Sequence, residues 1–481
     1  MSYLGHIVLN SRVTYGKNKK NVTYYAFKPY QKENENENVM IVPYKKETKE
    51  DQTNVYVIAT INENNPNHKN HIIMSIQAIL GKVGTPEAEA LYLQHKHNVR
   101  TLTKKKTILQ PRNYFEQIIA EEATKRNKKE DQVYTIDPEG SSDYDDAISI
   151  NINNNKTTIG VHIADVSFLV SPDSELDKYA KQSLTSIYSN YLKPNNMLPS
   201  YICNDLMSLK ETKPRLCVSI YYHYNQDKEL LHTSIERETL IVTKNCTYKN
   251  VRKYLNKDQW NTLTYHSKTT DTHKIVETYM LQTNVLVANI LANKSPNNCI
   301  LRAQEKTIIP EHIDNEFYKK MCNNNATYIL GNNNKNQSTT HSSLNEEYYT
   351  HFTSPLRRYA DIIAHRQLFS KIYQVNEETI NSINAINKLS TRLRSDEHKL
   401  QLIYDLEQQW KNNETLLQYK GTVMKEENEQ VYVHVNIKEK DYLLRIKTNK
   451  KEIKQFKTII IEIIPNINAS IFSKKLKLKI I

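Results

Sequence analysis

Four aspartates crowded into one short segment, Asp137, Asp143, Asp145 and Asp146, constrain this chain more than any other feature. So much like charge in one loop is unfavourable unless cations neutralise it. Oxygen ligands without a neighbouring His or Cys suit Mg2+ or Mn2+ better than zinc. The segment therefore predicts a site for a divalent metal, with Mg2+ as the first candidate and Mn2+ as the second.

The residues around the acidic segment separate a metal site from two alternatives. An EF-hand loop counted from Asp137 would need glycine where Ser142 stands and glutamate where Ile148 stands. A solvated acidic turn is the simpler alternative, and it explains most acidic clusters. Here apolar residues flank the segment, with Ile136 before it and Ala147 after it. We therefore expect a loop that is anchored in a core.

The chain as a whole is basic. Its 66 Lys and Arg residues outnumber 53 Asp and Glu residues, which gives a net charge of +13 over 481 residues. An acidic pocket inside a basic protein is the arrangement expected of an enzyme that acts on a polyanion, because the basic surface attracts phosphates. Charge alone does not establish this function, since many Lys-rich proteins bind no anion.

Cysteine spacing and hydropathy indicate the cellular compartment in which the protein is expected to work. No two cysteines form a Cys-x-x-Cys pair, so we expect free thiols rather than a zinc site or disulfides. No stretch approaches the roughly 18 consecutive apolar residues of a transmembrane helix, and the first residues lack the pattern of a secretory signal. We expect an intracellular protein, cytoplasmic or nuclear, that is not secreted and does not bind a membrane.

Composition divides the chain into four segments. Residues 1–98 alternate short strands with polar turns, which predicts a small β-barrel ending in a helix. Residues 99–132 form a charged connector with a helix expected at 118–125. Residues 133–415 alternate strands and helices, and residues 416–481 return to the strand pattern of a second small barrel.

A second unusual stretch contains two adjacent arginines, Arg357 and Arg358. Pro355 fits the first turn of a helix, with Thr353 or Ser354 as its cap. Both arginines would then lie near a helix N-terminus, where guanidinium groups hold a phosphate with two hydrogen bonds. Taken alone, the stretch is equally consistent with a basic surface turn.

Together with the acidic segment, this stretch resembles the ribonuclease II/R family of RNB-domain exoribonucleases, which includes the catalytic subunit of the exosome. The matching blocks follow the family order and cover about half of the chain. They are the four aspartates, the run from Gly160 to Ser167, Met197 to Pro199, Ser208-Leu209, Arg215, His341-x-x-Leu344, and the run from Tyr349 to Tyr359.

The resemblance implies an α+β multidomain fold, in which a central RNB catalytic domain with a mixed sheet and helices lies between small OB-fold β-barrels. It implies a hydrolase that degrades single-stranded RNA from the 3′ end and releases nucleoside 5′-monophosphates by a two-metal mechanism. In this reading residues 1–98 are an OB-fold or cold-shock-like RNA-binding barrel, residues 133–415 the catalytic domain and residues 416–481 a C-terminal OB-fold-like barrel.

The resemblance also implies roles for individual residues. The four aspartates would bind the metal or orient its water, with Asp145 and Arg357 acting in catalysis. Arg357 would neutralise charge on the scissile phosphate. The residues expected to bind the RNA are Tyr188, Tyr248, Glu277 and Arg358. Without the family, a place in the core is the better explanation of either tyrosine.

One departure from the family concerns the clamp on the terminal base. The segment between Tyr248 and Glu277 is short and contains no Phe that could oppose Tyr188. Trp260 or Tyr265 could take that place, so the length of the end product stays open.

Three alternatives remain at this point. The first rival to an active exoribonuclease is a catalytically inactive RNB-fold protein that binds RNA or serves as a scaffold. The second is a DNA exonuclease, because recognition of the 2′-hydroxyl depends on geometry. For the C-terminal barrel, RNA contacts through Arg445, Lys447, Lys450 and Lys451, with stacking on Tyr432 or Tyr442, compete with a purely stabilising role.

Overall fold

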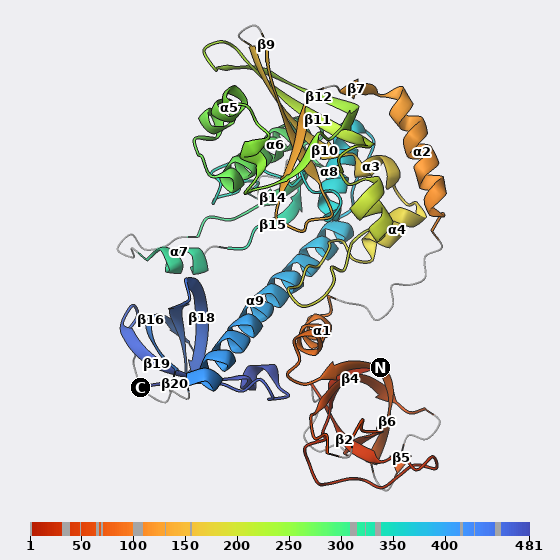
Figure 1. Cartoon of the computed structure of the whole chain (residues 1–481), viewed down its shortest axis with the longest axis vertical. Coiled ribbons are helices and arrows are strands. Elements are labelled where there is room, and N and C mark those ends of the chain that lie inside the picture. Colours follow the sequence, from red (N-terminus) through yellow and green to blue (C-terminus); the bar gives the residue numbers. More distant parts are fainter. Residues whose placement is uncertain are drawn as a thin grey trace.

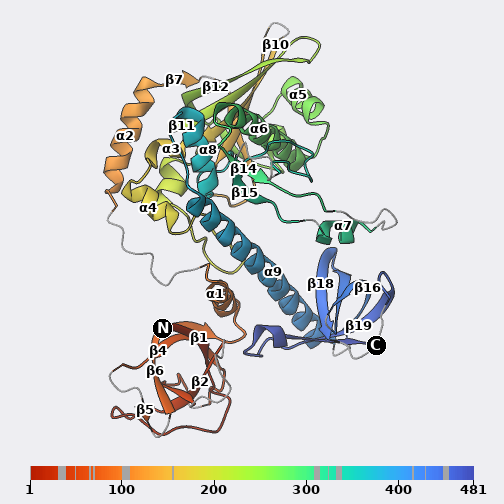
Figure 2. The same cartoon turned by 180° about the vertical axis from the view of Figure 1, so that it is seen from behind.

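The protein consists of a central α/β unit with two smaller β units beside each other below it (Figure 1). A long helix runs diagonally from the central unit to the C-terminal β unit, and the view from behind gives the same arrangement (Figure 2). This computed structural model describes residues 2–30, 39–48, 50–63, 67–68, 71–99, 109–129, 131–153, 156–307, 315–322, 324–331, 338–413, 417–427, 429–447 and 454–481.

The N-terminal unit is a β-barrel. Its strands have the order β3-β2-β1-β4-β6-β5, and β3 also pairs in parallel with β6, which closes the barrel. The helix α1 follows directly, as expected from the sequence. The bounds are β1 (Ser2–Ile7), β2 (Tyr24–Pro29), β3 (Met40–Pro43), β4 (Val55–Ile61), β5 (Asn67–His68), β6 (His71–Lys82) and α1 (Pro86–Lys96).

The central unit is built on a seven-stranded mixed sheet in the order β13-β8-β9-β10-β11-β12-β7. The strands β8 to β11 are rich in buried Val, Ile and Leu, because helices or loops cover the sheet on both faces. The bounds are β7 (Asn127–Lys129), β8 (Val133–Asp137), β9 (Asp146–Asn153), β10 (Lys156–Ala164), β11 (Pro214–Tyr224), β12 (Leu230–Ile241) and β13 (Lys244–Thr247).

Helices flank this sheet, with α5 and α6 to one side and α2 and α4 to the other (Figure 1). The strands β14 and β15 form a separate two-stranded sheet. The bounds are α2 (Arg112–Lys125), α3 (Val166–Leu169), α4 (Glu175–Lys181), a π-helical turn (Ile202–Leu206), a 3-10 turn (Val251–Lys253), α5 (Lys257–Ser267), α6 (Thr272–Lys294), β14 (Ile300–Ala303), α7 (Glu316–Cys322), β15 (Thr327–Leu330) and α8 (Tyr359–Phe369).

The C-terminal unit is a five-stranded antiparallel sheet in the order β18-β17-β16-β19-β20. It packs on the long helix α9, whose Leu402 and Leu406 belong to its core. The bounds are α9 (Glu377–Asn413), β16 (Leu417–Glu427), β17 (Gln430–Ile437), β18 (Lys440–Lys447), β19 (Thr458–Pro465), a 3-10 turn (Phe472–Lys474) and β20 (Leu476–Ile480). The expected fold, a mixed α and β core between two OB-like β units, is confirmed.

The three units share one hydrophobic cluster. It joins Tyr92 of α1, Leu393 of α9, Phe472 of the C-terminal unit and Ile187 of the central unit. Inside the same junction Lys475 and Glu89 form an ion pair of 2.9 Å with both side chains fully buried. The C-terminal unit is therefore held against the N-terminal unit as well as against α9.

The helix α6 is, among the described residues, the one helix long and apolar enough to cross a membrane by length and composition alone. A count of consecutive apolar residues did not select it, because Thr, Gln and Asn interrupt the run. It packs against α5, α8, β10 and β14, and its Tyr279 and Val287 are fully buried. This is the packing of a helix inside a domain.

Candidate active site

The acidic loop connects two neighbouring antiparallel strands, since β8 ends at Asp137 and β9 begins at Asp146. The loop is pinned at several points. The backbone N–H of Tyr144 donates to the Ser208 hydroxyl at 2.9 Å, and the N–H of Ala164 donates to the Asp145 carbonyl at 2.9 Å. The expectation of an anchored loop is therefore confirmed, and the Ser208-Leu209 motif has a structural reason.

Asp145 joins the acidic loop to the arginine segment. Its carboxylate is 3% exposed and accepts hydrogen bonds from the Leu356 backbone N–H at 2.8 Å and from Arg357 Nε at 3.0 Å. The Arg357 guanidinium also donates to the Ser354 hydroxyl at 3.0 Å. These bonds fix the guanidinium beside the acidic loop.

The expected helix start at Pro355 is wrong, because α8 begins at Tyr359. Arg358 has an extended backbone, with φ −133° and ψ 124°, and forms a β-bridge with Thr185. Pro355 and Arg357 lie in a turn in which the N–H groups of Arg357 and Arg358 donate to the Ser354 carbonyl. The arginines therefore precede the helix, and tertiary hydrogen bonds rather than a helix N-terminus position them.

All the candidate residues line one cavity of about 1100 Å³. Tyr188, which is 42% exposed and hence not a core aromatic, donates its hydroxyl to Asp143. Tyr248 lies in the cavity wall with its ring centroid 5.0 Å from that of His273. The nine predicted residues that line the cavity are Asp137, Asp143, Asp145, Asp146, Tyr188, Tyr248, Glu277, Arg357 and Arg358.

The substitutes suggested for the missing Phe are not in this cavity. Trp260 packs against the core on α5 with the Arg252 guanidinium 5.0 Å from its ring. Tyr265 is 53% exposed and has the Lys228 ammonium 3.9 Å above its ring. Neither residue lines the cavity, so neither opposes Tyr188.

Burial raises the pKa values of three of the carboxyl groups, and at Asp137 and Asp145 the neighbouring carboxylates add to it. Burial, together with Asp146, Asp145 and Asp143, raises the pKa of Asp137 to about 8. Burial raises the pKa of Asp145 to about 7 against the opposing effect of Arg357. Burial raises the pKa of Asp146 to about 6, although Arg357 and Arg358 lower it. Without a cation, the protein holds these groups together at a cost in free energy.

This donor set fits a divalent cation of the Mg2+ or Mn2+ type. All four side chains offer oxygen atoms, and the Asp137 Oδ2 atom is buried without a hydrogen-bond partner among the described residues. A buried carboxylate oxygen without a donor is unfavourable unless a cation or water satisfies it. All four aspartates would contribute to holding the ion, and Asp145 is the one that also accepts a hydrogen bond from Arg357.

We expect the affinity for Mg2+ to increase as the pH rises from about 6 to about 8. The carboxyl groups of Asp137, Asp145 and Asp146 lose their protons across this range, and an ion binds only after the protons leave. The measurement is the increase in thermal unfolding temperature at a fixed Mg2+ concentration at each pH. A larger increase at the acidic end of the range would contradict this assignment, and Asp137→Asn should weaken the dependence on pH.

The inner wall of the cavity also contains residues whose role the sequence did not indicate. His341, Tyr349 and His351 stood within recognised motifs, but the motifs did not indicate which side chains face the site. Asn284 and Arg302 also line the cavity. They are single polar residues on α6 and β14, so no local pattern pointed to them.

The comparisons with known proteins agree with this geometry. A family model described as RNB domain matches residues 125–268 and 309–374. The chain belongs to the RNB-domain family. The RNB-domain match includes the acidic loop, both tyrosines and both arginines, whereas Glu277 lies between its two segments.

Two relatives of this RNB-domain protein show how far the likeness extends. Ribonuclease R of Chlamydia trachomatis is 27% identical over 325 residues, which are 52% of this chain and 46% of that protein. The chain thus spans less than half the length of this relative. RNase R of Mycoplasma genitalium, in complex with ribose methylated single-stranded RNA, has a TM-score of 0.72 at 17% identity and covers 100% of this chain and 90% of that chain.

A second similar solved structure is that of a pseudonuclease. Yeast Ssd1, a pseudonuclease, has a TM-score of 0.63 at 16% identity and covers 90% of this chain and 63% of that chain. At such low identity the likeness concerns the fold alone. The fold is therefore shared by nucleases and by a pseudonuclease, and activity has to be argued from the residues of the site.

Proposed function

We propose that this protein is a metal-dependent exoribonuclease that hydrolyses single-stranded RNA from the 3′ end and releases nucleoside 5′-monophosphates. One observation carries the proposal: four carboxylates and Arg357 line the same cavity, with Asp145 bound to Arg357 at 3.0 Å. Carboxylates that hold Mg2+ beside a guanidinium are suited to a reacting phosphodiester, because its transition state is rich in negative charge.

Each group has a part in the proposed reaction. Arg357 would hold the scissile phosphate and neutralise the charge that develops on it. Tyr188 and Tyr248 would stack on the terminal bases, and Glu277 and Arg358 would contact the RNA end. When bound between the carboxylates, two Mg2+ ions would activate the attacking water and stabilise the leaving 3′ oxygen.

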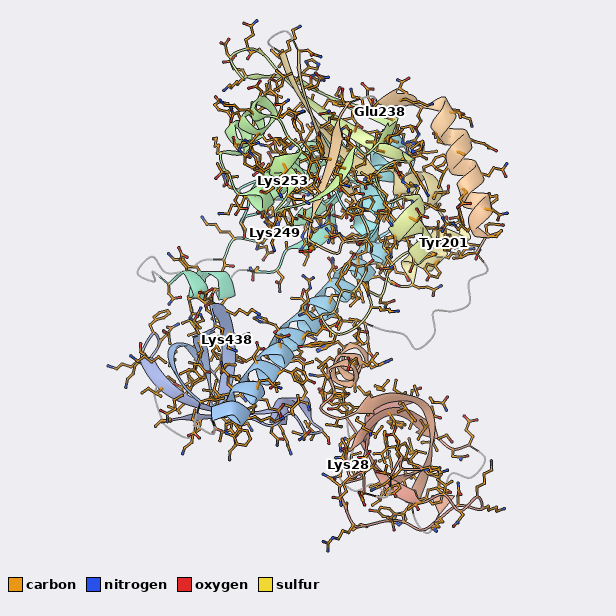
Figure 3. The ribbon with its side chains drawn as sticks, in the orientation of Figure 1. Lys28, Tyr201, Glu238, Lys249, Lys253 and Lys438 are labelled. Carbon is orange, nitrogen blue, oxygen red and sulfur yellow. The ribbon has the colours of Figure 1, made fainter. Side chains whose placement is uncertain are left out.

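The surface charge supports an RNA substrate. The exposed residues Lys28, Lys249, Lys253 and Lys438 lie on three different units of the molecule (Figure 3). Lys249 and Lys253 follow Tyr248, which lines the cavity. Basic groups near the site would attract the phosphates of a strand and hold it while its end is cleaved.

In the C-terminal unit, fewer residues are candidates for RNA contacts than the sequence indicated. Tyr442 is 4% exposed and stacks on His398 with 4.5 Å between ring centroids, so it has no free face for a base. Arg445 and Lys447 are exposed on β18 and remain candidates for phosphate contacts. Lys450 and Lys451 lie outside the described residues.

An inactive RNA-binding or scaffold protein is the second candidate, and the likeness to a pseudonuclease favours it. The raised pKa values of Asp137, Asp145 and Asp146 argue against it. A protein without catalysis would have no reason to keep a cluster of carboxyl groups in a place where burial makes their ionisation unfavourable. All five cysteines lie in the described part of the chain and none of them forms a disulfide, which supports the intracellular location that we propose.

The test of this function uses single-stranded RNA and DNA of one sequence, each labelled at the 5′ end. We expect the full chain with Mg2+ to convert the RNA into a ladder that shortens from the 3′ end, and EDTA to stop the reaction. Intact RNA under all conditions would favour the inactive protein. Equal degradation of DNA would show that the 2′-hydroxyl is not recognised.

We expect Arg357→Lys to reduce the rate of hydrolysis far more than the affinity for RNA. Lysine keeps the charge but loses the planar guanidinium that bonds both Asp145 and Ser354. The loss of a transition-state donor costs about 2–4 kcal/mol in the barrier. Single-turnover rates and RNA affinity measured on the same variant separate the two effects. A normal rate with lost affinity would make Arg357 a docking residue.

A further inference from the structure

The cavity becomes more buried along α6. Residues at successive turns of α6 line the cavity wall, from the exposed His273 and Glu277 to Asn284, which is 4% exposed. The amide of Asn284 donates to the Tyr349 hydroxyl at 3.2 Å and accepts from the Phe352 backbone N–H at 2.8 Å. The inner end of the cavity is therefore the part around Asn284 and Tyr349.

Aromatic and basic side chains form this inner end. The Tyr349 ring packs edge-on against His341 and His351, with centroid distances of 5.1 Å and 5.5 Å. His351 Nδ1 is 2.5 Å from the Tyr328 hydroxyl, and the Arg302 guanidinium lies 5.0 Å from the Tyr328 ring centroid. These contacts connect Arg302 to the inner wall through a continuous set of rings.

The charge at the inner end is positive. Arg358 is paired with Asp361 at 2.8 Å, and Arg357 is paired with Asp145. Among the described residues no carboxylate forms an ion pair with Arg302. Burial, Arg358 and Arg302 lower the pKa of His351 well below its usual value, so this ring is neutral and leaves the charge of Arg302 in place.

Two buried nitrogen atoms at this end also lack partners. Arg358 Nε and His341 Nδ1 are buried without a hydrogen bond to any described residue, and His341 is only 8% exposed. Both residues line the cavity. Buried polar atoms are nearly always satisfied by protein, water or a ligand. Together with Arg302 they mark a place suited to an anion.

We propose that Arg302, Arg358 and His341 form a pocket for a phosphate group on the 3′ end of the RNA. The inference rests on the proposed function, because an exonuclease that starts at the 3′ end admits the terminal nucleotide first. The scissile phosphate would lie at the acidic loop and Arg357, so the 3′ position of the terminal ribose faces the inner end. A guanidinium there complements a phosphate monoester. The enzyme would therefore accept RNA that ends in a 3′-phosphate as a substrate.

The first cleavage of such a strand has a defined product. Water attacks the phosphorus of the last internucleotide linkage, and the bond from this phosphorus to the 3′ oxygen of the preceding nucleotide breaks. That oxygen takes up a proton, and the terminal residue leaves as a nucleoside 3′,5′-bisphosphate. Every later step acts on a 3′-hydroxyl end and releases a 5′-monophosphate.

The experiment compares two 5′-labelled RNAs that differ only in a 3′-phosphate or a 3′-hydroxyl. For the full chain we expect kcat/KM on the 3′-phosphate RNA to be at least equal to that on the 3′-hydroxyl RNA. Arg302→Met should lower the ratio of the two values about tenfold or more, since hydrogen bonds to a charged group are lost. Arg252→Met is the matched control, because Arg252 also lies over an aromatic ring but outside the cavity, and it should leave the ratio unchanged.

A second measurement keeps the proposal testable if Arg302→Met does not fold. Adenosine 3′,5′-bisphosphate should inhibit the unmodified chain at concentrations at least about tenfold lower than adenosine 5′-monophosphate does. Equal inhibition by both nucleotides would contradict the proposed pocket. So would a kcat/KM on the 3′-phosphate RNA below one tenth of the value on the 3′-hydroxyl RNA. An unchanged ratio in a folded Arg302→Met variant also overturns it.

The outcomes for the pocket and for the proposed function are separate. If the 3′-hydroxyl RNA is degraded and the 3′-phosphate RNA is not, the exonuclease stands and the pocket is wrong. If neither RNA is degraded, the proposed function fails. Direct titration of the protein with the bisphosphate and the monophosphate then decides whether Arg302 binds a phosphate.

Discussion

The Asp145→Asn variant loses hydrolytic activity by at least about a thousandfold while its affinity for single-stranded RNA is retained. The change removes one negative charge from the set that holds Mg2+. It also disturbs Arg357, because both carboxylate oxygens of Asp145 accept hydrogen bonds, from Leu356 N–H and from Arg357 Nε. An amide offers one acceptor oxygen only, so one of these donors faces an NH2 group. The substitution therefore slows hydrolysis and does not weaken RNA binding.

Single-turnover hydrolysis and equilibrium RNA binding are the measurements for this variant. Asp173→Asn is a suitable control, since Asp173 is exposed and does not line the cavity. It should retain full activity. Substantial hydrolysis by Asp145→Asn, in a preparation free of contaminating nuclease, would refute the role of Asp145.

The Lys475→Met variant loses about 3–5 kcal/mol of stability at the junction of the three units. Lys475 and Glu89 are both fully buried, and Lys475 also donates to the Ile467 carbonyl. Removing the ammonium leaves the Glu89 carboxylate buried without its counter-charge. The burial that already raises the pKa of Glu89 is then no longer opposed by Lys475. Urea unfolding followed by circular dichroism measures the loss.

Two further variants test the cause of this loss. Lys474 is the exposed neighbour of Lys475, and Lys474→Met should change stability little. The double change Glu89→Gln with Lys475→Met should recover part of the loss, because no charge is then left buried. A Lys475→Met protein as stable as the original would show that the junction does not depend on the pair.

The acidic loop could be predicted from the sequence because its information is local. The four aspartates and their apolar neighbours lie in one short loop and the strand ends on either side of it. Asp137 is the last residue of β8 and Asp146 is the first residue of β9, the neighbouring strand. The resemblance then identified the arginines and tyrosines that share the cavity with them. The strands of both β units were visible as alternating β-branched residues for the same reason.

The parts that the sequence did not predict depend on distant partners. Pro355 was a reasonable helix start, but Leu356 and Arg357 bond to Asp145, which is more than two hundred positions away. The pairing of Glu89 with Lys475 joins opposite ends of the chain. Arg302 and Asn284 enter the cavity only because α6 and β14 pack beside the arginine segment.

The most direct test of the central claim is the identity of the product released from uniformly labelled single-stranded RNA in the presence of Mg2+. If the carboxylates and Arg357 act on the last phosphodiester of a strand, nucleoside 5′-monophosphates appear from the earliest times. Their formation stops when EDTA removes the metal. Chromatography that shows internal fragments, nucleoside 3′-monophosphates or unreacted RNA would contradict the account.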